Sequence, residues 1–343
     1  MALVMRPAVL RDEVQAMTRP ESLIWIITGR CNLRCPYCYA EQYMNDEELG
    51  AREMIGVLEE AADTGARYVQ FTGGEPLLRR DIIDVLEATV ELGLDASIFT
   101  NMTLMNNRIA ARLARLGIDV YTSLDGPRDV YELVKGKGSW ERFLSGVKTA
   151  KTMGLWLHVN IPVSKLNFNR VSDAIRLAID LGADSISLIP TMPSGRALRT
   201  KSFIGHDLFL RALRDAEQVA EELGIGIAVW CAPFVRALSW TKHLIASNCR
   251  DWLVMDIAPN GDVLLCDVTG IRVANVVRDG VLEAWRKLLE RPLMKAAMKI
   301  PEECKDCAIR AWCRGGCYTR ALAKYGRLPA PDPLCPLIAK RNS

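Results

Sequence analysis

Cysteine is the residue type whose number and spacing most constrain the chemistry of this chain. The eleven cysteines lie at positions 31, 35, 38, 231, 249, 266, 304, 307, 313, 317 and 335. In a short secreted chain they would indicate disulfides, but 343 residues with no recognisable secretory signal are expected to stay in a reducing compartment. Metal ligation is therefore the leading interpretation. Because three cysteines lie near the start and seven lie after residue 248, two metal-binding regions are predicted.

The first group forms a Cys-x3-Cys-x2-Cys motif, with Cys31, Cys35 and Cys38 directly after an expected strand. Barrel and open-sheet enzymes place their chemistry in the loops at the carboxyl ends of strands. A structural zinc ion takes four protein ligands, whereas a [4Fe–4S] cube takes one external ligand per iron. Three thiolates therefore leave one iron open. Zinc with a distant fourth ligand, or reduced structural thiols, are the alternatives.

The segments that must position this motif alternate between strand and helix patterns from residue 23 to about residue 190. Six strands are predicted, at residues 23–28, 67–72, 96–100, 119–123, 156–161 and 185–189. Helices are predicted at residues 81–92, 108–116, 140–153, 171–181 and 207–223. Four of them precede glycines suited to left-handed caps, Gly93, Gly117, Gly154 and Gly182. The predicted fold is α/β, a partial (β/α)6 barrel of the TIM type, although periodicity alone does not exclude a flat sheet.

Four regions are predicted along the chain, an N-terminal arm over residues 1–22, the partial barrel over 23–205, a connecting helix and linker over 206–240, and a small Cys-rich domain over 241–343. After Pro233 the alternation ends, and Cys, Gly and Pro punctuate short elements. Such a domain is organised by bound metal more than by a hydrophobic core.

Composition excludes several classes of function. The 44 basic and 41 acidic residues leave a net charge of +3, with no basic block that would indicate nucleic-acid binding. The longest apolar runs, such as residues 23–27, are too short to cross a bilayer, so a cytoplasmic protein without a membrane partner is expected. The three histidines lie in no nucleophile–base pattern, and the first strand leads into cysteines instead of a GxGxxG turn. A hydrolase and a dinucleotide-dependent dehydrogenase are therefore set aside.

With Tyr37 directly before its last cysteine, the first motif resembles the hallmark of the radical S-adenosylmethionine (SAM) superfamily. The resemblance implies that Cys31, Cys35 and Cys38 hold an oxygen-sensitive [4Fe–4S] cluster whose open iron is chelated by the amino and carboxylate groups of SAM. It also implies one-electron cleavage of SAM to a 5′-deoxyadenosyl radical, which abstracts hydrogen from the substrate. A low-potential electron donor of the ferredoxin or flavodoxin type is the partner this chemistry implies. Tyr37 is counted among the SAM-binding residues.

The segment after the second predicted strand, Gly73-Gly74-Glu75-Pro76, resembles the motif of this family that binds the SAM amino group. The glycines permit a close approach of backbone to a ligand, and Glu75 offers an acceptor for an ammonium group. An ordinary strand-to-helix turn is the alternative. Further along, Asn101 lacks the glycine that usually follows it in this family and is given only a weak role.

The fourth predicted strand ends in Ser123-Leu124-Asp125-Gly126, and similar segments occur in one subgroup of the family. Ser123 and Asp125 would meet the ribose or the amino-acid end of SAM, and a plain Asp-Gly turn is the alternative. Lys135 lies where many relatives carry an arginine that meets the SAM carboxylate. Lysine keeps the positive charge and loses the bidentate fork.

The later cysteines resemble the SPASM domain, a seven-cysteine extension of radical SAM enzymes, at every cysteine and at Gly261. The resemblance implies one auxiliary [4Fe–4S] cluster on Cys304, Cys307, Cys313 and Cys335, and a second that uses Cys249, Cys266 and Cys317. A pair of zinc ribbons is the alternative.

The second auxiliary cluster lacks an obvious fourth ligand. Sulfatase-maturing relatives have an extra cysteine a few residues before the first, where this chain has only His243. His243, Cys231 and a substrate atom are the options, or the cluster is partly assembled. By default Cys231, which neither motif uses, is a small buried apolar residue. Asp267 matches a carboxylate that takes a proton in the sulfatase-maturing relatives, and a loop aspartate capping a backbone amide is an equal alternative.

Together these patterns predict a radical SAM oxidoreductase. Oxidative modification or cross-linking of a peptide or protein side chain is the first hypothesis, because such substrates are common in SPASM relatives. A radical step in tetrapyrrole or other small-molecule cofactor biosynthesis is the second. A zinc-binding, non-enzymatic scaffold is the alternative from another class, but a scaffold has no need for an open three-thiolate site.

Overall fold

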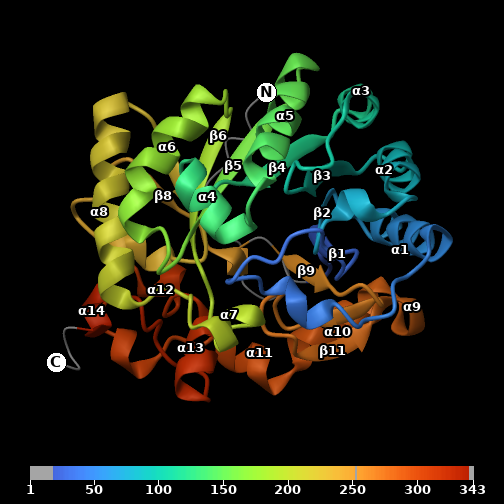
Figure 1. Ribbon diagram of the computed structural model, residues 1–343. Coiled ribbons are helices and arrows are strands. Elements are labelled where there is room, and N and C mark those ends of the chain that lie inside the picture. The colour runs from blue at the N-terminus through green and yellow to red at the C-terminus, as the bar shows by residue number, and fades with distance from the viewer. Residues whose placement is uncertain (1–17, 252, 340–343) are drawn as a thin grey trace.

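The computed structural model describes residues 18–251 and 253–339, in which helices surround a long sheet (Figure 1). The sheet contains eleven strands in the order β11-β10-β9-β1-β2-β3-β4-β5-β6-β7-β8. The strands are β1 Ser22–Ile26, β2 Tyr68–Thr72, β3 Asp95–Phe99, β4 Asp119–Ser123, β5 Leu157–Val163, β6 Ser185–Pro190, β7 Ile227–Val229, β8 Leu244–Ala246, β9 Val254–Ile257, β10 Asp262–Leu264 and β11 Arg272–Asn275. Of the arm predicted over residues 1–22, residues 1–17 lie outside the described residues.

The helices of the first half lie mainly between consecutive parallel strands, as crossover helices do. They are α1 Ala51–Asp63, α2 Ile82–Glu91, α3 Asn107–Leu116, α4 Arg128–Lys135, α5 Ser139–Thr152, α6 Val171–Asp180, α7 Arg196–Thr200 and α8 His206–Leu223. The later helices are shorter, namely α9 Val276–Asp279, α10 Val281–Glu290, α11 Pro292–Ala297, α12 Arg310–Cys313, α13 Tyr318–Tyr325 and α14 Pro336–Ala339. Within the described ranges, none of these helices has the length and hydropathy needed to cross a membrane.

The six predicted strands correspond to β1–β6, which run parallel in sequential order. Every residue of β5 is buried, as expected for a parallel strand that is covered on both faces. The four glycines predicted as helix caps all adopt positive φ, at Gly93, Gly117, Gly154 and Gly182. The α/β fold with a parallel sheet of barrel type is therefore confirmed.

Two further parallel strands, β7 and β8, extend this run beyond the six predicted from the sequence. Helix α8, expected to lead out of the barrel, is the crossover between β6 and β7 and packs beside α6 (Figure 1). Each of the two strands has only three residues, which is too short for an alternating pattern to be recognised. The sequence therefore predicted the six strands between residues 23 and 190 and not these two.

Three strands of the predicted C-terminal domain, β9 to β11, continue the same sheet on the other side of β1. Strand β9 pairs in parallel with β1, and β10 and β11 follow as antiparallel neighbours. The register places Asp256 beside Ile24. The barrel and the Cys-rich region thus share one sheet, while the predicted domain boundaries stay a prediction.

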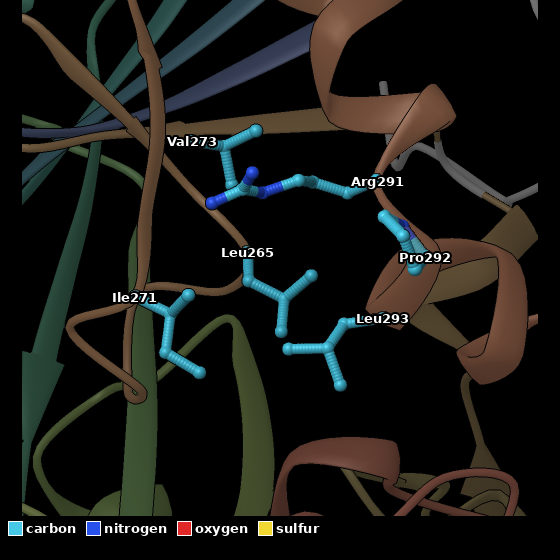
Figure 2. A pocket seen from close by; sticks show the side chains of 6 residues that line it. All are labelled: Leu265, Ile271, Val273, Arg291, Pro292 and Leu293. Atoms are coloured by element: carbon cyan, nitrogen blue, oxygen red, sulfur yellow. The ribbon is translucent and has the colours of Figure 1, made fainter.

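An apolar pocket of about 200 Å³ lies where the β10–β11 segment meets the start of α11. In Figure 2 the side chains of Leu265 and Leu293 face each other across it, and Arg291 reaches toward Val273. This volume is below the roughly 300 Å³ at which pockets for drug-sized ligands begin. We therefore treat it as a packing feature of the segment that positions Cys266.

Candidate active site

The three cysteines of the first motif lie in the loop after β1, at the carboxyl edge of the parallel strands. Burial, with smaller contributions from the thiols of Cys38 and Cys31, raises the pKa of Cys35 to about 11. Burial also raises the pKa of Cys31, and the Cys38 thiol contributes to it. The three sulfurs are thus close enough to interact and match the donor set of a cube with one open iron. Cys31 and Cys35 would release protons on binding metal.

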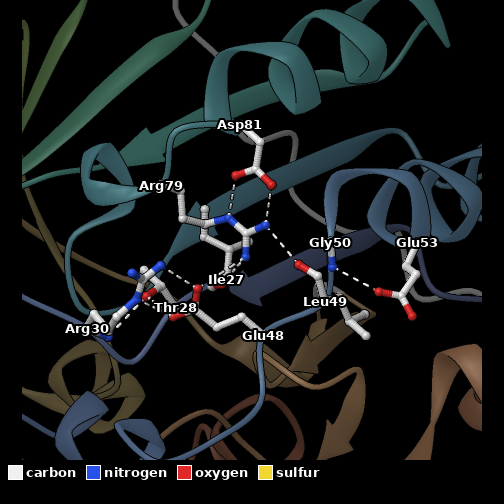
Figure 3. Close-up of polar contacts among 9 residues, drawn as sticks. All are labelled: Ile27, Thr28, Arg30, Glu48, Leu49, Gly50, Glu53, Arg79 and Asp81. Carbon is white, nitrogen blue, oxygen red and sulfur yellow. Dashed lines mark hydrogen bonds and ion pairs between the residues drawn. The ribbon is translucent and has the colours of Figure 1, made fainter.

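Arg79 holds both ends of this loop together (Figure 3). Its Nη1 donates to the carbonyl oxygen of Ile27 at 2.9 Å, and its Nη2 donates to that of Leu49 at 2.8 Å. Asp81 accepts from Nε at 2.9 Å and from Nη2 at 2.7 Å, which orients the guanidinium. Arg79 is only 6% exposed, so these bonds form away from water. Arg79 was not predicted from the sequence, because no local pattern links it to backbone groups so distant along the chain.

Glu48 adds a second connection between the start and the end of the loop (Figure 3). Its carboxylate accepts from Arg30 Nε at 3.0 Å and from Arg30 Nη2 at 2.7 Å. The Thr28 hydroxyl donates to the same carboxylate and accepts from the Arg30 backbone N–H at 3.0 Å. The backbone just before the first cysteine is therefore fixed by charge-assisted bonds.

Gly73 and Gly74 are required by contacts with this loop. The N–H of Gly74 donates to Thr28 at 2.7 Å, and the N–H of Glu75 donates to Arg30 at 2.8 Å, both to carbonyl oxygens. A Cβ on Gly74 would lie 2.1 Å from the Arg30 carbonyl oxygen, and one on Gly73, whose φ is 145°, would lie 2.4 Å from that of Thr28. The two glycines thus allow the backbone of residues 73–75 to pack directly against the backbone of residues 28–30. The predicted approach to a ligand stays a prediction.

Glu75 is fully buried beneath the cysteine loop. Its Oε1 accepts from Leu77 N–H at 3.0 Å and from the Thr100 hydroxyl at 2.6 Å, while Oε2 accepts from Asn101 N–H at 2.7 Å. Burial raises the pKa of Glu75, and these three donors oppose that shift. The side-chain nitrogen of Asn101 lies 3.9 Å from the Cys31 sulfur. Glu75 is therefore hydrogen-bonded to Asn101, and Asn101 in turn lies beside the sulfur of Cys31.

Four of the residues predicted to meet SAM come together on another side of the loop. The Tyr37 hydroxyl donates to Asp125 Oδ1 at 2.5 Å. The ammonium of Lys135 donates to Ser123 Oγ at 2.7 Å and to the Tyr37 oxygen at 3.2 Å, and lies 3.5 Å from Asp125 Oδ2. Asp125 Oδ2 is buried and has no hydrogen-bond donor within the described residues. The charges of Lys135 and Asp125 both act on the Cys35 thiol, so this group faces the cysteines.

Helix α7 supports the cysteine loop from the end of β6. The backbone N–H of Arg196 donates to the carbonyl oxygen of Cys38 at 3.0 Å, and its Nη1 donates to that of Cys35 at 3.0 Å. The Thr200 hydroxyl donates to the carbonyl oxygen of Pro36 at 2.8 Å. The guanidinium of Arg196 thus bonds to the loop itself.

Asp267, the predicted base, lies between the cysteine loop and the second group of cysteines. The Tyr39 side chain interacts with its carboxylate and opposes the effect of burial on its pKa, and the Tyr43 hydroxyl donates to its carbonyl oxygen at 2.5 Å. The Cys266 sulfur lies 3.3 Å from Asp267 Oδ1, and Asp267 N–H donates to Asp256 Oδ2 at 3.1 Å. Burial raises the pKa of both carboxyls, and the charge of Asp267 raises that of Asp256 further. Such a pair retains a proton more readily than isolated carboxylates.

Long-range contacts assemble the residues that carry Cys249, Cys266 and Cys317. Nη1 of Arg250 donates to the carbonyl oxygen of the residue before Cys317 at 2.7 Å. The Tyr318 hydroxyl donates to the carbonyl oxygen of the residue before Cys266 at 2.8 Å. The guanidinium of Arg250 lies 5.1 Å from the Tyr318 ring centre. The neighbour of Cys249 in sequence thus bonds to the neighbour of Cys317, and another neighbour of Cys317 bonds to the neighbour of Cys266. These bonds bring the three cysteines into one region.

The remaining cysteines form a second group near the C-terminal end. The N–H of Cys307 donates to the carbonyl oxygen of Cys304 at 3.1 Å, which places both in one turn. Burial raises the pKa of Cys313 and of Cys335 to about 12 each. The neighbouring thiol of Cys304 makes a small further contribution to the rise at Cys335. Neighbouring members of the predicted set of four thiols thus interact with one another. Their role as ligands of one cluster stays a prediction.

The contacts of His243 give no support to its predicted role as a ligand beside Cys249, Cys266 and Cys317. Its Nδ1 lies 3.1 Å from Glu217 Oε1 on α8, and its backbone N–H donates to the same carboxylate. It precedes β8, whereas Cys249 follows β8. At about 3.3 Å per strand residue, the two lie at opposite edges of the sheet.

Comparison with known proteins agrees with both cysteine patterns. Residues 25–178 match the family model of the radical SAM superfamily, and residues 249–308 match that of the SPASM iron–sulfur cluster-binding domain. Among curated proteins, the chain is 29% identical over 339 residues to a PqqA peptide cyclase of Streptomyces rochei, covering 95% of this chain and 92% of the relative. It is 27% identical over 345 residues to the PqqA peptide cyclase of Rhizobium meliloti, covering 97% and 91%.

Solved structures share the fold at low sequence identity. A native anSMEcpe with bound AdoMet and a Cp18Cys peptide has a TM-score of 0.72 and 19% identity, covering 94% of this chain and 95% of that one. Streptococcus suis SuiB bound to its precursor peptide SuiA has a TM-score of 0.69 and 18% identity, covering 90% and 74%. The architecture therefore extends over nearly the whole chain.

Proposed function

We propose that this chain, which belongs to the radical SAM superfamily and carries a SPASM domain, oxidises or cross-links side chains of a peptide substrate. One observation supports this above the others. The open three-thiol loop continues through Tyr39 to the carboxylate of Asp267, directly beside Cys266. A hydrogen-abstraction site and a proton acceptor would therefore face one substrate.

The cluster and SAM fit the residues present. Cys31, Cys35 and Cys38 would hold the cluster, since three interacting thiols match a cube with one open iron. When bound, the cluster and SAM supply a 5′-deoxyadenosyl radical that removes a hydrogen atom from the substrate. We expect a ferredoxin- or flavodoxin-type protein to supply the electrons.

The residues around the loop would bind and orient SAM through complementary charges. Glu75 already accepts three donors, so its carboxylate is held in place to face an ammonium group. Lys135 is held by Ser123 and Tyr37, and its charge would meet the SAM carboxylate at the expense of its 3.5 Å contact with Asp125. Tyr37 would then keep Asp125 in place through its 2.5 Å bond.

After one hydrogen atom has been removed, completing the oxidation releases one proton and one electron from the side chain. Asp267 is the proposed acceptor of the proton, and an auxiliary cluster held by the later cysteines would accept the electron. The carboxylate of Asp267 is held by Tyr39 and lies next to Asp256, whose Oδ1 has no hydrogen-bond partner within the described residues. A proton taken up by either carboxyl can be shared by the pair, because the second charge favours protonation of the first.

A peptide substrate is favoured by the kinds of protein that resemble the chain from end to end. The curated relatives are named peptide cyclases, and the chain covers 91 to 92% of the two described above. Two structural neighbours contain bound peptides. We therefore place the substrate class with peptides ahead of tetrapyrroles or other small molecules.

The test is anaerobic incubation of the reconstituted protein with SAM, dithionite and peptides encoded beside its reading frame. The expected result is 5′-deoxyadenosine together with a peptide that has lost two hydrogens. The matched control is the protein with Cys31, Cys35 and Cys38 all changed to Ala, which should form neither product. A protein that binds zinc in place of iron, or that cleaves no SAM when fully loaded with iron, would overturn the proposal.

A further inference from the structure

Cys231 lies at the same edge of the sheet as Cys249. Strands β7 and β8 pair in parallel with Val229 beside Ala246, and Cys231 and Cys249 follow these residues by two and three positions. The N–H of Ser247 donates to the Val229 carbonyl oxygen at 3.2 Å, so the pairing continues past the end of β8. Two adjacent parallel strands therefore deliver two thiols to one place.

A buried arginine connects Cys231 to Cys317 in the C-terminal region. Nη2 of Arg320 donates to the Cys231 carbonyl oxygen at 2.5 Å and to Asp332 Oδ2 at 3.0 Å. The same Asp332 oxygen accepts the N–H of Cys317 at 3.0 Å. Arg320 is 2% exposed and Asp332 is fully buried, so this connection is shielded from water.

The backbone at Cys231 adopts a conformation that a non-glycine residue avoids. Its φ is +54°, in the left-handed region, which is unfavourable for a residue with a Cβ. Such conformations persist where surrounding contacts impose them and cluster at functional sites. The bond from Arg320 to the carbonyl of Cys231 is the contact that fixes this one.

The sulfur of Cys231 also interacts with the other thiols. Burial raises the pKa of Cys231 well above its usual value, and the neighbouring thiols of Cys317 and Cys249 raise it further. The pKa of Cys266 is raised in the same way, by burial first, with contributions from Cys249 and Cys317. Cys231, Cys249, Cys266 and Cys317 thus form a connected set of four thiols.

Two carboxylates are the rival ligands in this region. Ligand atoms of Asp256, Cys266 and Asp267 lie within 4.8 Å of one another. Iron–sulfur clusters, however, are held mainly by thiolates, which are softer ligands than carboxylates. Asp267 is also engaged by Tyr39. A fourth thiol is therefore the better match for this cluster.

We propose that Cys231, at the end of the seventh barrel strand, is the fourth protein ligand of the auxiliary iron–sulfur cluster that Cys249, Cys266 and Cys317 hold. The barrel then contributes one ligand to a cluster that otherwise belongs to the C-terminal region. All four irons have protein ligands, so this cluster has no open site for substrate. The inference rests on the proposed iron–sulfur chemistry and assigns a residue that neither cysteine motif includes.

The experiment uses the full chain with Cys31, Cys35 and Cys38 changed to Ala, so that only auxiliary clusters remain. Iron content and electron paramagnetic resonance (EPR) spectra are compared before and after Cys231→Ala, with and without added cyanide. We expect either a fall in iron of about half, from two clusters to one, or a cluster whose spectrum becomes cyanide-sensitive because one iron is open. His243→Gln is the matched control and should change neither readout.

Cys231→Ser guards against a folding failure of the alanine variant, because it preserves the size of the side chain. We expect it to retain iron with a shifted midpoint potential, since an oxygen ligand replaces sulfur. Unchanged iron, cyanide response and potential in both variants would overturn the inference, as would a cyanide response that appears only in Asp267→Asn. If the starting variant binds no iron at all, the proposed function fails instead.

Discussion

At the scale of single residues, the buried pair of Lys135 and Asp125 has the largest energetic consequence. Asp125 is fully buried and Lys135 is 7% exposed, so water screens neither charge. Removing one member of such a pair leaves an uncompensated buried charge, whereas removing both does not. The same lysine is the proposed partner of the SAM carboxylate, so stability and ligand binding depend on it in separable ways.

We predict that Lys135→Met lowers the free energy of unfolding by about 3–5 kcal/mol, because it leaves Asp125 charged and unpaired. SAM affinity should fall at least about tenfold, which corresponds to 1.4 kcal/mol. Chemical denaturation and equilibrium dialysis with labelled SAM measure the two effects.

The double variant Lys135→Met with Asp125→Asn separates the effect on stability from the effect on SAM affinity. Stability should largely recover, because no unpaired charge remains, while SAM affinity should stay low. Full recovery of SAM binding in the double variant would show that Lys135 has only a structural role.

Several residues of the site could be predicted from the sequence, but their contacts and backbone conformations could not. Tyr37, Ser123 and Lys135 were all named, and they do meet around Asp125. Met102, which directly follows Asn101, has a φ of +65°, in the left-handed region that favours glycine. Nothing local in the sequence indicates that a methionine adopts this conformation.

At the scale of elements, the cysteine loop is positioned by three neighbours, the Gly73–Glu75 turn, Arg79 and α7. None is adjacent to it in sequence, and each bonds to its backbone or its flanks. A loop of this kind cannot be predicted from local propensity, because its shape is determined by distant partners.

The contribution of Arg79 to the stability of the cysteine loop can be measured by comparing the same substitution at Arg79, which is buried, and at Arg30, which is exposed. Arg79→Lys should lower the free energy of unfolding by about 2–3 kcal/mol, because buried bonds to charged groups are lost. Arg30→Lys should change it by less than about 1 kcal/mol, because the Arg30 side chain is 60% exposed. Denaturant unfolding of the metal-free chains measures both, and equal effects would contradict the role assigned to Arg79.

The pairing of β5 and β6 carries a prediction about pH. His158 on β5 lies 2.7 Å from Ser187 Oγ on β6 and stacks on Trp230 at 4.9 Å between ring centres. Burial lowers the pKa of His158 from 6.5 to about 3. Below pH 6.5 the unfolded chain binds a proton that the folded chain excludes, so the folded state loses stability as the pH falls.

This loss should amount to about 1 kcal/mol per pH unit between pH 6.5 and pH 3. Unfolding midpoints at pH 7 and pH 5 measure it, with His158→Gln as the control. The glutamine variant retains a hydrogen bond to Ser187 but should show a smaller decrease. An identical decrease in both chains would contradict the assignment.

The elements themselves were largely predictable where their patterns are long. Strands β1 to β6 and the helices capped by Gly93 and Gly117 follow from alternation and turn chemistry. Strands β7 and β8 were missed because three residues carry no period. Strand β9 gave no signal that it would pair with β1, since partner choice is a tertiary property.

At the scale of the whole molecule, one sheet joins the two cysteine regions. Because β9 pairs with β1, the segment after β10 brings Cys266 and Asp267 beside the loop that carries Cys38 and Tyr39. On the opposite side, β7 and β8 bring Cys231 and Cys249 to the same edge. The fold thus brings residues of the two cysteine regions into contact with each other.

The proposed function depends above all on Cys31, Cys35 and Cys38 holding a cluster with one iron open to SAM. Its most direct test is the EPR spectrum of the anaerobically reconstituted, dithionite-reduced protein before and after addition of SAM. We predict a SAM-dependent change that disappears when the three cysteines are replaced by alanine, while the auxiliary signals persist. A fully iron-loaded protein whose spectrum SAM leaves unchanged would contradict the account.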